Sequence, residues 1–200
     1  MDAGAGLAWR RRSRARVVAP HALVRTGPGR GDIVTPVFWH ARLVPRRKRN
    51  RWREVELPDG RCGWIEARAV ELRQRRKIPL ERLVRRLLGT PYFWGGRTPL
   101  GFDCSGFVQQ VMAERNVSLP RDADDQRRAV RSLRLRERPR VGDLVFFGRR
   151  RGRLTHVGIM VGKGLYAHSR GMVRINSLEH SHVLYDKDLA AMFRGYGRRF

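Results

Sequence analysis

The pattern of the chain changes at a short basic segment, Arg73–Lys77, which we expect to be a linker, and this change limits the folds that are available. Before it, from Val17 to Leu72, apolar residues occur in short runs broken by turn residues, which is typical of β-strands. After it, apolar residues recur at helical spacing between Leu80 and Leu88, and later in continuous runs. We therefore expect a flexible basic arm over residues 1–16, a small all-β module over 17–75 and a larger α+β domain over 76–200.

The expected β module contains five candidate strands, and five short strands in about 55 residues suggest a small barrel. These strands are Ala22–Arg25, Asp32–Phe38, Ala41–Val44, Trp52–Leu57 and Gly63–Ile65. Pro58-Asp59-Gly60 predicts a turn, because Pro suits the second turn position and Gly tolerates a positive φ. The run Arg46–Arg51 predicts a charged hairpin tip.

The α+β domain is expected to begin with a helix after Pro79, ended by Gly89 and Pro91. A segment rich in Gly and Pro then predicts a loop as far as Gly101. Apolar residues after Cys104 predict one buried face of a second helix, with Asp103 as its N-cap; they are Phe107, Val108, Val111 and Met112.

A cysteine in the first turn of a helix is the first candidate for chemistry. Unpaired backbone N–H groups and the helix dipole favour an anion there, and so lower the pKa of a thiol such as Cys104. The same N–H groups can donate to an oxyanion. A buried, unreactive cysteine is the alternative, because a lone Cys often packs as a small apolar side chain. This pattern alone leaves both interpretations open.

Two histidines lie on a predicted hairpin that turns at Gly162–Gly164. We expect His156 and His168 to lie opposite or diagonal to each other, roughly 5–8 Å apart between Cβ atoms, with the register left open. A neutral His156 can take the thiol proton, while His168 bonds its other ring nitrogen and fixes the tautomer. The alternatives are ordinary strand histidines, or a zinc site shared with Cys104.

Five motifs occur in an order that is similar to a known family. Together they resemble the NlpC-type cell-wall cysteine peptidases, over about residues 78–199; the motifs are Tyr92–Gly96, Phe102–Phe107, Leu119–Asp122, Gly142–Phe147 and Thr155–Ile159. The resemblance implies a papain-like core with an antiparallel sheet and N-terminal helices. The run Trp52–Ile65 resembles the closing hairpin of bacterial SH3-like domains, and Val173–Leu178 looks typical of the branch that carries them. That branch resembles γ-D-glutamyl-L-diamino-acid endopeptidases of the dipeptidyl-peptidase VI type.

The resemblance also implies a role for individual residues of the reaction centre. Cys104 is implied as the nucleophile, His156 as the base and His168 as the polar third member. Tyr92 is implied to line the site and support the oxyanion.

Substrate binding is implied for a second group of residues. Asp103 and Ser105 would bind the free amino group of an N-terminal L-Ala, and Arg121 is expected beside the substrate. A carboxylate next to an ammonium disfavours a blocked amine. The chain departs from the family at Ala123, where many relatives have a serine that also contacts the amine. It also has one SH3-like module, where many relatives have two.

The expected activity is hydrolysis of the γ-D-Glu–diamino-acid bond of murein peptides through an acyl-enzyme, as in murein peptide recycling, with no cofactor and no metal. One alternative is another papain-like hydrolase or acyltransferase. The other is a basic binding protein with an inactive site, which the net charge of +26 favours, because such a surface attracts nucleic acid and anionic polymers non-specifically.

Composition limits the cell-biological expectations. Two cysteines cannot form a disulfide framework, nor hold a structural zinc by themselves. Apolar runs fall short of the roughly 20 residues of a membrane span. Met1–Pro20 has basic residues with no apolar stretch behind them, so we expect no signal peptide and a cytoplasmic protein, with export by an unseen route as the alternative.

Overall fold

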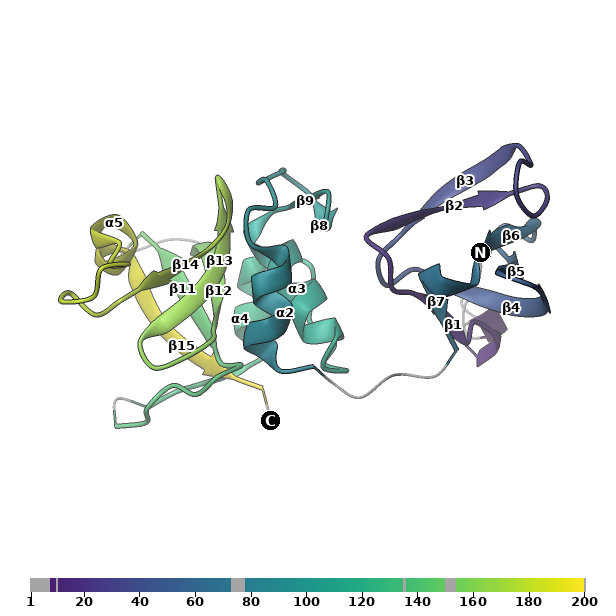
Figure 1. Cartoon of the computed structure of the whole chain (residues 1–200). Coiled ribbons are helices and arrows are strands. Elements are labelled where there is room, and N and C mark those ends of the chain that lie inside the picture. Colours follow the sequence, from purple (N-terminus) through teal and green to yellow (C-terminus); the bar gives the residue numbers. More distant parts are fainter. Residues whose placement is uncertain (1–7, 10, 73–77, 135, 150–153, 200) are drawn as a thin grey trace. The chain divides into compact units, whose positions relative to one another are not determined.

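The computed structural model describes residues 8–9, 11–72, 78–134, 136–149 and 154–199 (Figure 1). The chain divides into two compact units, Met1–Arg76 and Lys77–Phe200. The basic segment Arg73–Lys77, expected to be a linker, lies outside the described residues. Within the described ranges, none of the helices has the length and apolar character needed to cross a membrane.

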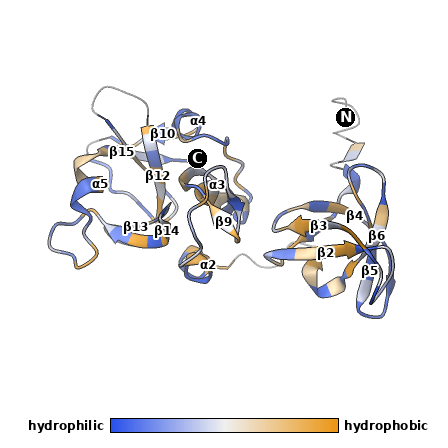
Figure 2. Ribbon diagram, turned by 90° about the horizontal axis from the view of Figure 1, so that it is seen from above, coloured by the Kyte–Doolittle hydropathy of each residue, from blue (hydrophilic) through white to orange (hydrophobic). Residues whose placement is uncertain are grey.

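The described part of the N-terminal unit is built on one antiparallel sheet with the strand order β3-β2-β6-β5-β4-β1-β7. Its core is a cluster of small and branched apolar side chains that includes Val24, Val55 and Ile65. Figure 2 shows β2 and β3 largely in hydrophobic colours and β4 largely in hydrophilic ones. The elements are β1 (Ala15–Val17), β2 (His21–Arg25), β3 (Ile33–Phe38), β4 (Arg42–Arg49), β5 (Trp52–Glu56), β6 (Cys62–Glu66), the 3-10 helix η1 (Ala67–Ala69) and β7 (Val70–Glu71). This unit is all-β as expected, while its SH3-like character stays a prediction.

The basic arm expected over residues 1–16 ends earlier than predicted, because Ala15 and Arg16 belong to strand β1. Strand β1 pairs with both β4 and β7, and Ala15 and Val17 are fully buried in the core. Arg16 lies between them and forms an ion pair with Glu71 of β7. The alternation of small apolar and charged residues is a strand signal too short to recognise among so many arginines. Residues 1–7 and 10 of the expected arm lie outside the described residues.

The charged hairpin tip expected over residues 46–51 is also shorter, because β4 and β5 leave only two residues between them. Asn50 adopts a positive φ of 51°, which Asn tolerates better than most residues. Arg46 pairs with Glu56, and Arg47 with Glu54, across the two strands. Cross-strand pairs of opposite charge let the basic run continue as a strand.

The C-terminal unit is an α+β fold around an antiparallel sheet of order β10-β15-β11-β12-β13-β14 among the described residues. Helices α2, α3 and α4 lie together on one side of this sheet, and α5 lies away from them (Figure 1). The helices are α2 (Leu80–Leu87), α3 (Cys104–Ala113), α4 (Ala123–Arg128) and α5 (Lys187–Ala191). The strands are β8 (Arg97–Thr98), β9 (Gly101–Phe102), β10 (Arg131–Ser132), β11 (Leu144–Gly148), β12 (Leu154–Met160), β13 (Leu165–Arg170), β14 (Met172–Ser177) and β15 (Phe193–Arg198).

The packing of α3 on the sheet is what positions the candidate site. Phe107, Val108 and Val111 of α3 are fully buried, and the helix contacts β12 and β13. Strand β11 is buried along its whole length, as its continuous apolar run predicts. The first turn of α3 is thereby held against strands that carry the two hairpin histidines.

Candidate active site

Cys104 is the first residue of α3, and Asp103 caps that helix, as the sequence predicted. The carboxylate Oδ1 of Asp103 accepts the N–H of Gly106 at 2.7 Å. A Cβ atom at Gly106 would lie 2.2 Å from the carbonyl oxygen of Gly96, so only glycine fits there. The first turn of α3 therefore packs directly against the Gly-rich loop, and this contact fixes the position of the Cys104 backbone.

The two histidines lie diagonally across the β12–β13 hairpin. His168 is the register partner of Gly158. His156 precedes Gly158 by two residues on β12, so the two histidines are diagonal neighbours. The Nε2 atom of His156 lies 2.8 Å from Nδ1 of His168, with the two rings nearly perpendicular. His156 is 8% exposed and His168 is completely buried. One of the two arrangements that the sequence left open is thus formed, and it includes a direct hydrogen bond.

Six of the seven candidate residues line one pocket of about 440 Å³ in the C-terminal unit; they are Tyr92, Asp103, Cys104, Ser105, Arg121 and His156. His168 does not line this pocket, and its Nδ1 atom is hydrogen-bonded to Nε2 of His156. Trp94 also lines the pocket and is 84% exposed. The pocket therefore combines a thiol and an imidazole with an open apolar wall, which is a suitable arrangement for acyl transfer to a nucleophile.

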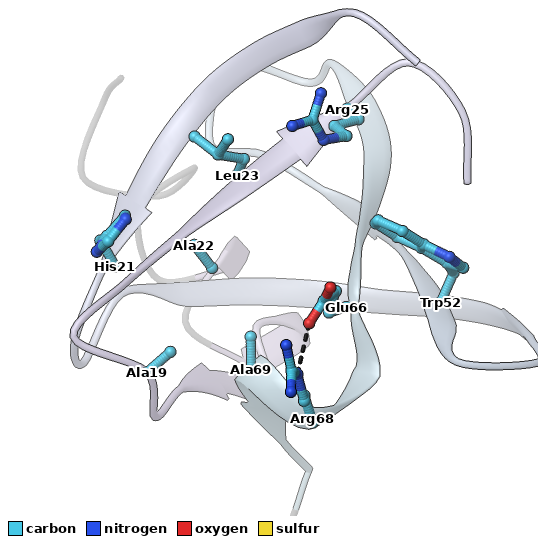
Figure 3. Close-up of a pocket in the computed structure, with 9 residues that line it drawn as sticks. All are labelled: Ala19, His21, Ala22, Leu23, Arg25, Trp52, Glu66, Arg68 and Ala69. Atoms are coloured by element: carbon cyan, nitrogen blue, oxygen red, sulfur yellow. Dashed lines mark hydrogen bonds and ion pairs between the residues drawn. The ribbon is translucent and has the colours of Figure 1, made fainter. Parts of the chain in front are cut away.

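A second pocket, of about 390 Å³, lies in the N-terminal unit (Figure 3). Glu66 and Arg68 form an ion pair within it. Its lining residues are Ala19, His21, Ala22, Leu23, Arg25, Trp52, Glu66, Arg68 and Ala69. This set contains neither a hydroxyl nor a thiol nucleophile, so the chemistry expected of Cys104 has no counterpart there.

Burial controls the protonation of the Cys104 thiol. Desolvation raises its pKa, and the backbone N–H groups of Val157 and Ser105 offset this only in part. The sequence predicted a lowered pKa from the helix N-terminus. The opposite direction results because the desolvation of the thiol outweighs the backbone N–H groups near the sulfur, among them that of Val157 on β12.

Burial also controls the protonation of the two histidines. It lowers the pKa of His156 to about 3, with the neighbouring His168 as a further cause. It lowers the pKa of His168 to about 4, although the hydrogen bond to Asn176 acts in the other direction. At neutral pH the site therefore holds a neutral thiol and two neutral imidazoles.

This protonation state predicts that any hydrolysis that uses His156 as a base keeps its kcat/KM down to an unusually low pH. A base must be neutral, so kcat/KM should stay level as the pH falls from 7 to about 5, below the ordinary histidine pKa of about 6.5. Steady-state kinetics from pH 4 to 8 measure this limit. Half-loss of kcat/KM near pH 6.5 would contradict it.

Acid also affects the fold, so the folded fraction must be measured by circular dichroism at each pH. The unfolded chain has histidines of ordinary pKa and binds more protons than the native state between about pH 6.5 and the lowered values. Stability therefore decreases as the pH falls through this range. Rates are compared only where the protein remains folded.

The carboxylate of Asp103 is fully engaged by the protein itself. Its Oδ1 accepts from Arg121, Ser105 and Gly106, and its Oδ2 accepts from Arg121 and from the N–H of Gly95. Arg121 also donates to Ser105 Oγ at 2.9 Å. The sequence expected Asp103 and Ser105 to receive a substrate ammonium. In this structure the guanidinium of Arg121 is the cation that bonds both residues.

Two residues of the site were missed by the sequence analysis. Asn176 Oδ1 lies 2.9 Å from Nε2 of His168, and Gln126 donates to the carbonyl oxygens of Ser105 and Pro120. Asn176 lies two positions beyond the register partner of His168 on β14, so it shares a strand face with that partner. The pairing of β13 with β14 was the information needed to find it.

A metal centre finds no support in the described part of the chain. No group of three or more His, Cys, Asp and Glu side chains there is arranged to hold a metal ion. The zinc site considered from Cys104, His156 and His168 is therefore not formed by these residues.

Comparison with known proteins places the C-terminal unit in context. The sequence profile of the NlpC/P60 family matches residues 89–192, more than half of the chain. The γ-D-glutamyl-L-lysine dipeptidyl-peptidase of Bacillus subtilis is 40% identical over 110 residues, which cover 54% of this chain and 37% of the relative. Dipeptidyl-peptidase 6 of Lysinibacillus sphaericus is 33% identical over 164 residues, which cover 74% of this chain and 57% of the relative. The chain thus spans less than two thirds of the length of these relatives.

Solved structures show a similar fold. An NlpC/P60 family protein from Bacillus cereus superimposes with a TM-score of 0.77 at 23% identity, over 96% of this chain and 66% of that chain. A protein of the same family from Staphylococcus aureus superimposes with a TM-score of 0.52 at 28% identity, over 60% of this chain and 40% of that one.

Proposed function

The chain belongs to the NlpC/P60 family, and we propose that it is a cysteine endopeptidase that hydrolyses the γ-D-Glu–diamino-acid bond of peptidoglycan peptides. The proposal is carried by one observation. Cys104 and His156 line the same pocket, and Nε2 of His156 is hydrogen-bonded to Nδ1 of His168. The similarity to a γ-D-glutamyl-L-lysine dipeptidyl-peptidase supports the choice of substrate class.

In the proposed reaction, the thiol proton of Cys104 passes to the free Nδ1 of His156 as the sulfur attacks the isopeptide carbonyl carbon. A neutral resting pair makes this transfer part of the attack, since burial disfavours a separated thiolate and imidazolium. The tetrahedral intermediate then expels the amine of the diamino acid, which takes the proton from His156. Water, activated by His156, hydrolyses the resulting thioester.

The oxyanion of this intermediate is proposed to bind at the start of α3 with help from Tyr92. Burial raises the pKa of Tyr92, and the negative charge of Asp103 acts in the same direction. The phenol therefore stays protonated and able to donate a hydrogen bond. Backbone N–H groups in the first helical turn supply further donors.

The proposal is tested by digesting L-Ala-γ-D-Glu-L-Lys, its meso-diaminopimelate counterpart and intact sacculi with the wild-type chain and with Cys104→Ala. Mass spectrometry should detect the L-Ala-D-Glu dipeptide and the free diamino acid with the wild type only. We propose a cytoplasmic protein acting on free peptides, so the tripeptides should be cleaved faster than sacculi. Equal turnover by Cys104→Ala would overturn the proposed nucleophile, and binding without turnover would support a binding protein with an inactive site.

A further inference from the structure

A backbone carbonyl determines the orientation of one amide beside the paired histidines. The Nδ2 atom of Asn176 donates to the carbonyl oxygen of Leu184 at 3.1 Å. That oxygen also accepts the backbone N–H of Ser177 at 2.8 Å. Because a carbonyl oxygen only accepts, the NH₂ group of Asn176 has to face it. The amide oxygen is thereby turned toward His168, 2.9 Å from Nε2.

This orientation dictates the protons on both imidazoles. Since the amide oxygen of Asn176 only accepts, neutral His168 carries its proton on Nε2 and offers a lone pair at Nδ1. His156 approaches that lone pair with Nε2 at 2.8 Å and must donate to it. A neutral imidazole has one proton, so the Nδ1 atom of His156 is left unprotonated.

We propose that Asn176 is a positioning residue that sets the tautomers of His168 and His156, so that an unprotonated ring nitrogen of His156 is available to the Cys104 thiol. The inference rests on the proposed function, because it explains how the proposed base is prepared. Asn176 acts through two histidines and does not itself touch the reacting atoms.

An amide suits this position better than a carboxylate would. A carboxylate at position 176 would stabilise the imidazolium form of His168, which has protons on both nitrogens. Its Nδ1–H would then donate to Nε2 of His156 and move the proton of His156 to Nδ1, which blocks the base. The charged and titratable groups around His168 are Arg170 of β13, Arg174 of β14, Asp186 before α5, His156 of β12 and Tyr166 of β13. Asp186 pairs with both arginines and balances one of their two positive charges, so the net charge beside His168 is positive and disfavours an imidazolium there.

The tautomers can be read directly by NMR of the full chain labelled with ¹⁵N-histidine. At pH 7 both His156 and His168 should carry the proton on Nε2. In Asn176→Leu the proton of His156 should move to Nδ1 in a substantial fraction of molecules. A wild-type His156 protonated at Nδ1 would overturn the inference. This measurement uses no substrate, so its failure is distinct from a failure of the proposed function.

Kinetics provide an independent test, because a merely structural role of Asn176 would not change the pH profile of the reaction. Asn176→Leu should lower kcat about 100-fold at every pH, with little change in KM, because the base is misprotonated. Asn176→Asp keeps the acceptor, so it should recover activity at alkaline pH. The pH at which its kcat begins to fall should be higher than in the wild type, because the carboxylate stabilises protonated His168. Equal losses in both variants with an unshifted pH profile would overturn the inference.

Gln109→Leu is the matched control. Gln109 also donates its amide to a backbone carbonyl, that of Leu119 at 2.9 Å, but this amide is not hydrogen-bonded to either histidine. It should keep its kcat and its pH profile, which separates the loss of an amide–carbonyl bond from the loss of the tautomer. If Asn176→Leu does not fold, the wild-type spectrum and the pH profile of Asn176→Asp decide the question.

Discussion

Replacing His156 with alanine is expected to remove nearly all hydrolysis, whereas His168→Asn is expected to keep a measurable part. Burial raises the pKa of Cys104, so the thiol depends on a nearby base to lose its proton. Loss of that base should lower kcat/KM by about 1,000- to 10,000-fold. An asparagine at position 168 can still accept from the Nε2–H of His156, so we expect a loss of only about 10- to 100-fold.

The two histidine variants need a control for folding and for general loss of an imidazole. His21→Ala serves this purpose, since His21 is exposed on β2 of the N-terminal unit. Its kcat/KM should equal that of the wild type. Thermal unfolding of all three variants identifies any loss that comes from the fold. A larger loss for His168→Asn than for His156→Ala, in folded protein, would show that the two roles were assigned the wrong way round.

The part of the site that could be predicted from sequence is the part that depends on local signals. The signals for the N-cap, for the buried face of the helix and for the Gly-rich loop before it all lie within a few residues of Cys104. The hairpin that carries His156 and His168 is likewise a local structure, because a short turn joins its strands. For these residues a short-range pattern already determines the backbone, and the structure adds the register.

The remaining features depend on contacts between distant segments. Arg121 bonds Asp103 although the two residues are 18 positions apart, and no local sequence pattern near either residue predicts this ion pair. Asn176 becomes significant only once β14 is paired with β13. The pKa direction of Cys104 was mispredicted because the helix N-terminus is visible in the sequence, whereas the burial of the thiol in the folded unit is not. Capping favours a thiolate and burial disfavours it, and here burial is the larger effect.

The pairing of Asp103 with Arg121 changes how a free substrate amine can be recognised. An ammonium that binds Asp103 has to compete with a guanidinium whose side chain is 31% exposed and therefore able to turn toward water. Such an exchange keeps the carboxylate paired throughout, which avoids the cost of an isolated buried charge. An acetylated amine offers no charge for this exchange. We therefore expect the wild type to cleave L-Ala-γ-D-Glu-L-Lys at least about tenfold faster in kcat/KM than its N-acetyl form, a difference of about 1.4 kcal/mol.

The ratio of the two kcat/KM values, free over acetylated, tests whether Asp103 is the residue that recognises the amine. Arg121→Ala should raise this ratio, because it leaves Asp103 free to pair with the ammonium, and Asp103→Asn should bring the ratio close to one.

Arg128→Ala is the matched control, because Arg128 lines the same pocket but pairs with Asp125. It removes the same charge without freeing Asp103, so any rise it causes measures general repulsion of the ammonium. Using a ratio cancels losses that affect both peptides equally, including those caused by a weakened α3 cap. If Arg121→Ala and Arg128→Ala change the ratio equally and Asp103→Asn leaves it unchanged, Asp103 serves only to cap α3 and to hold Arg121.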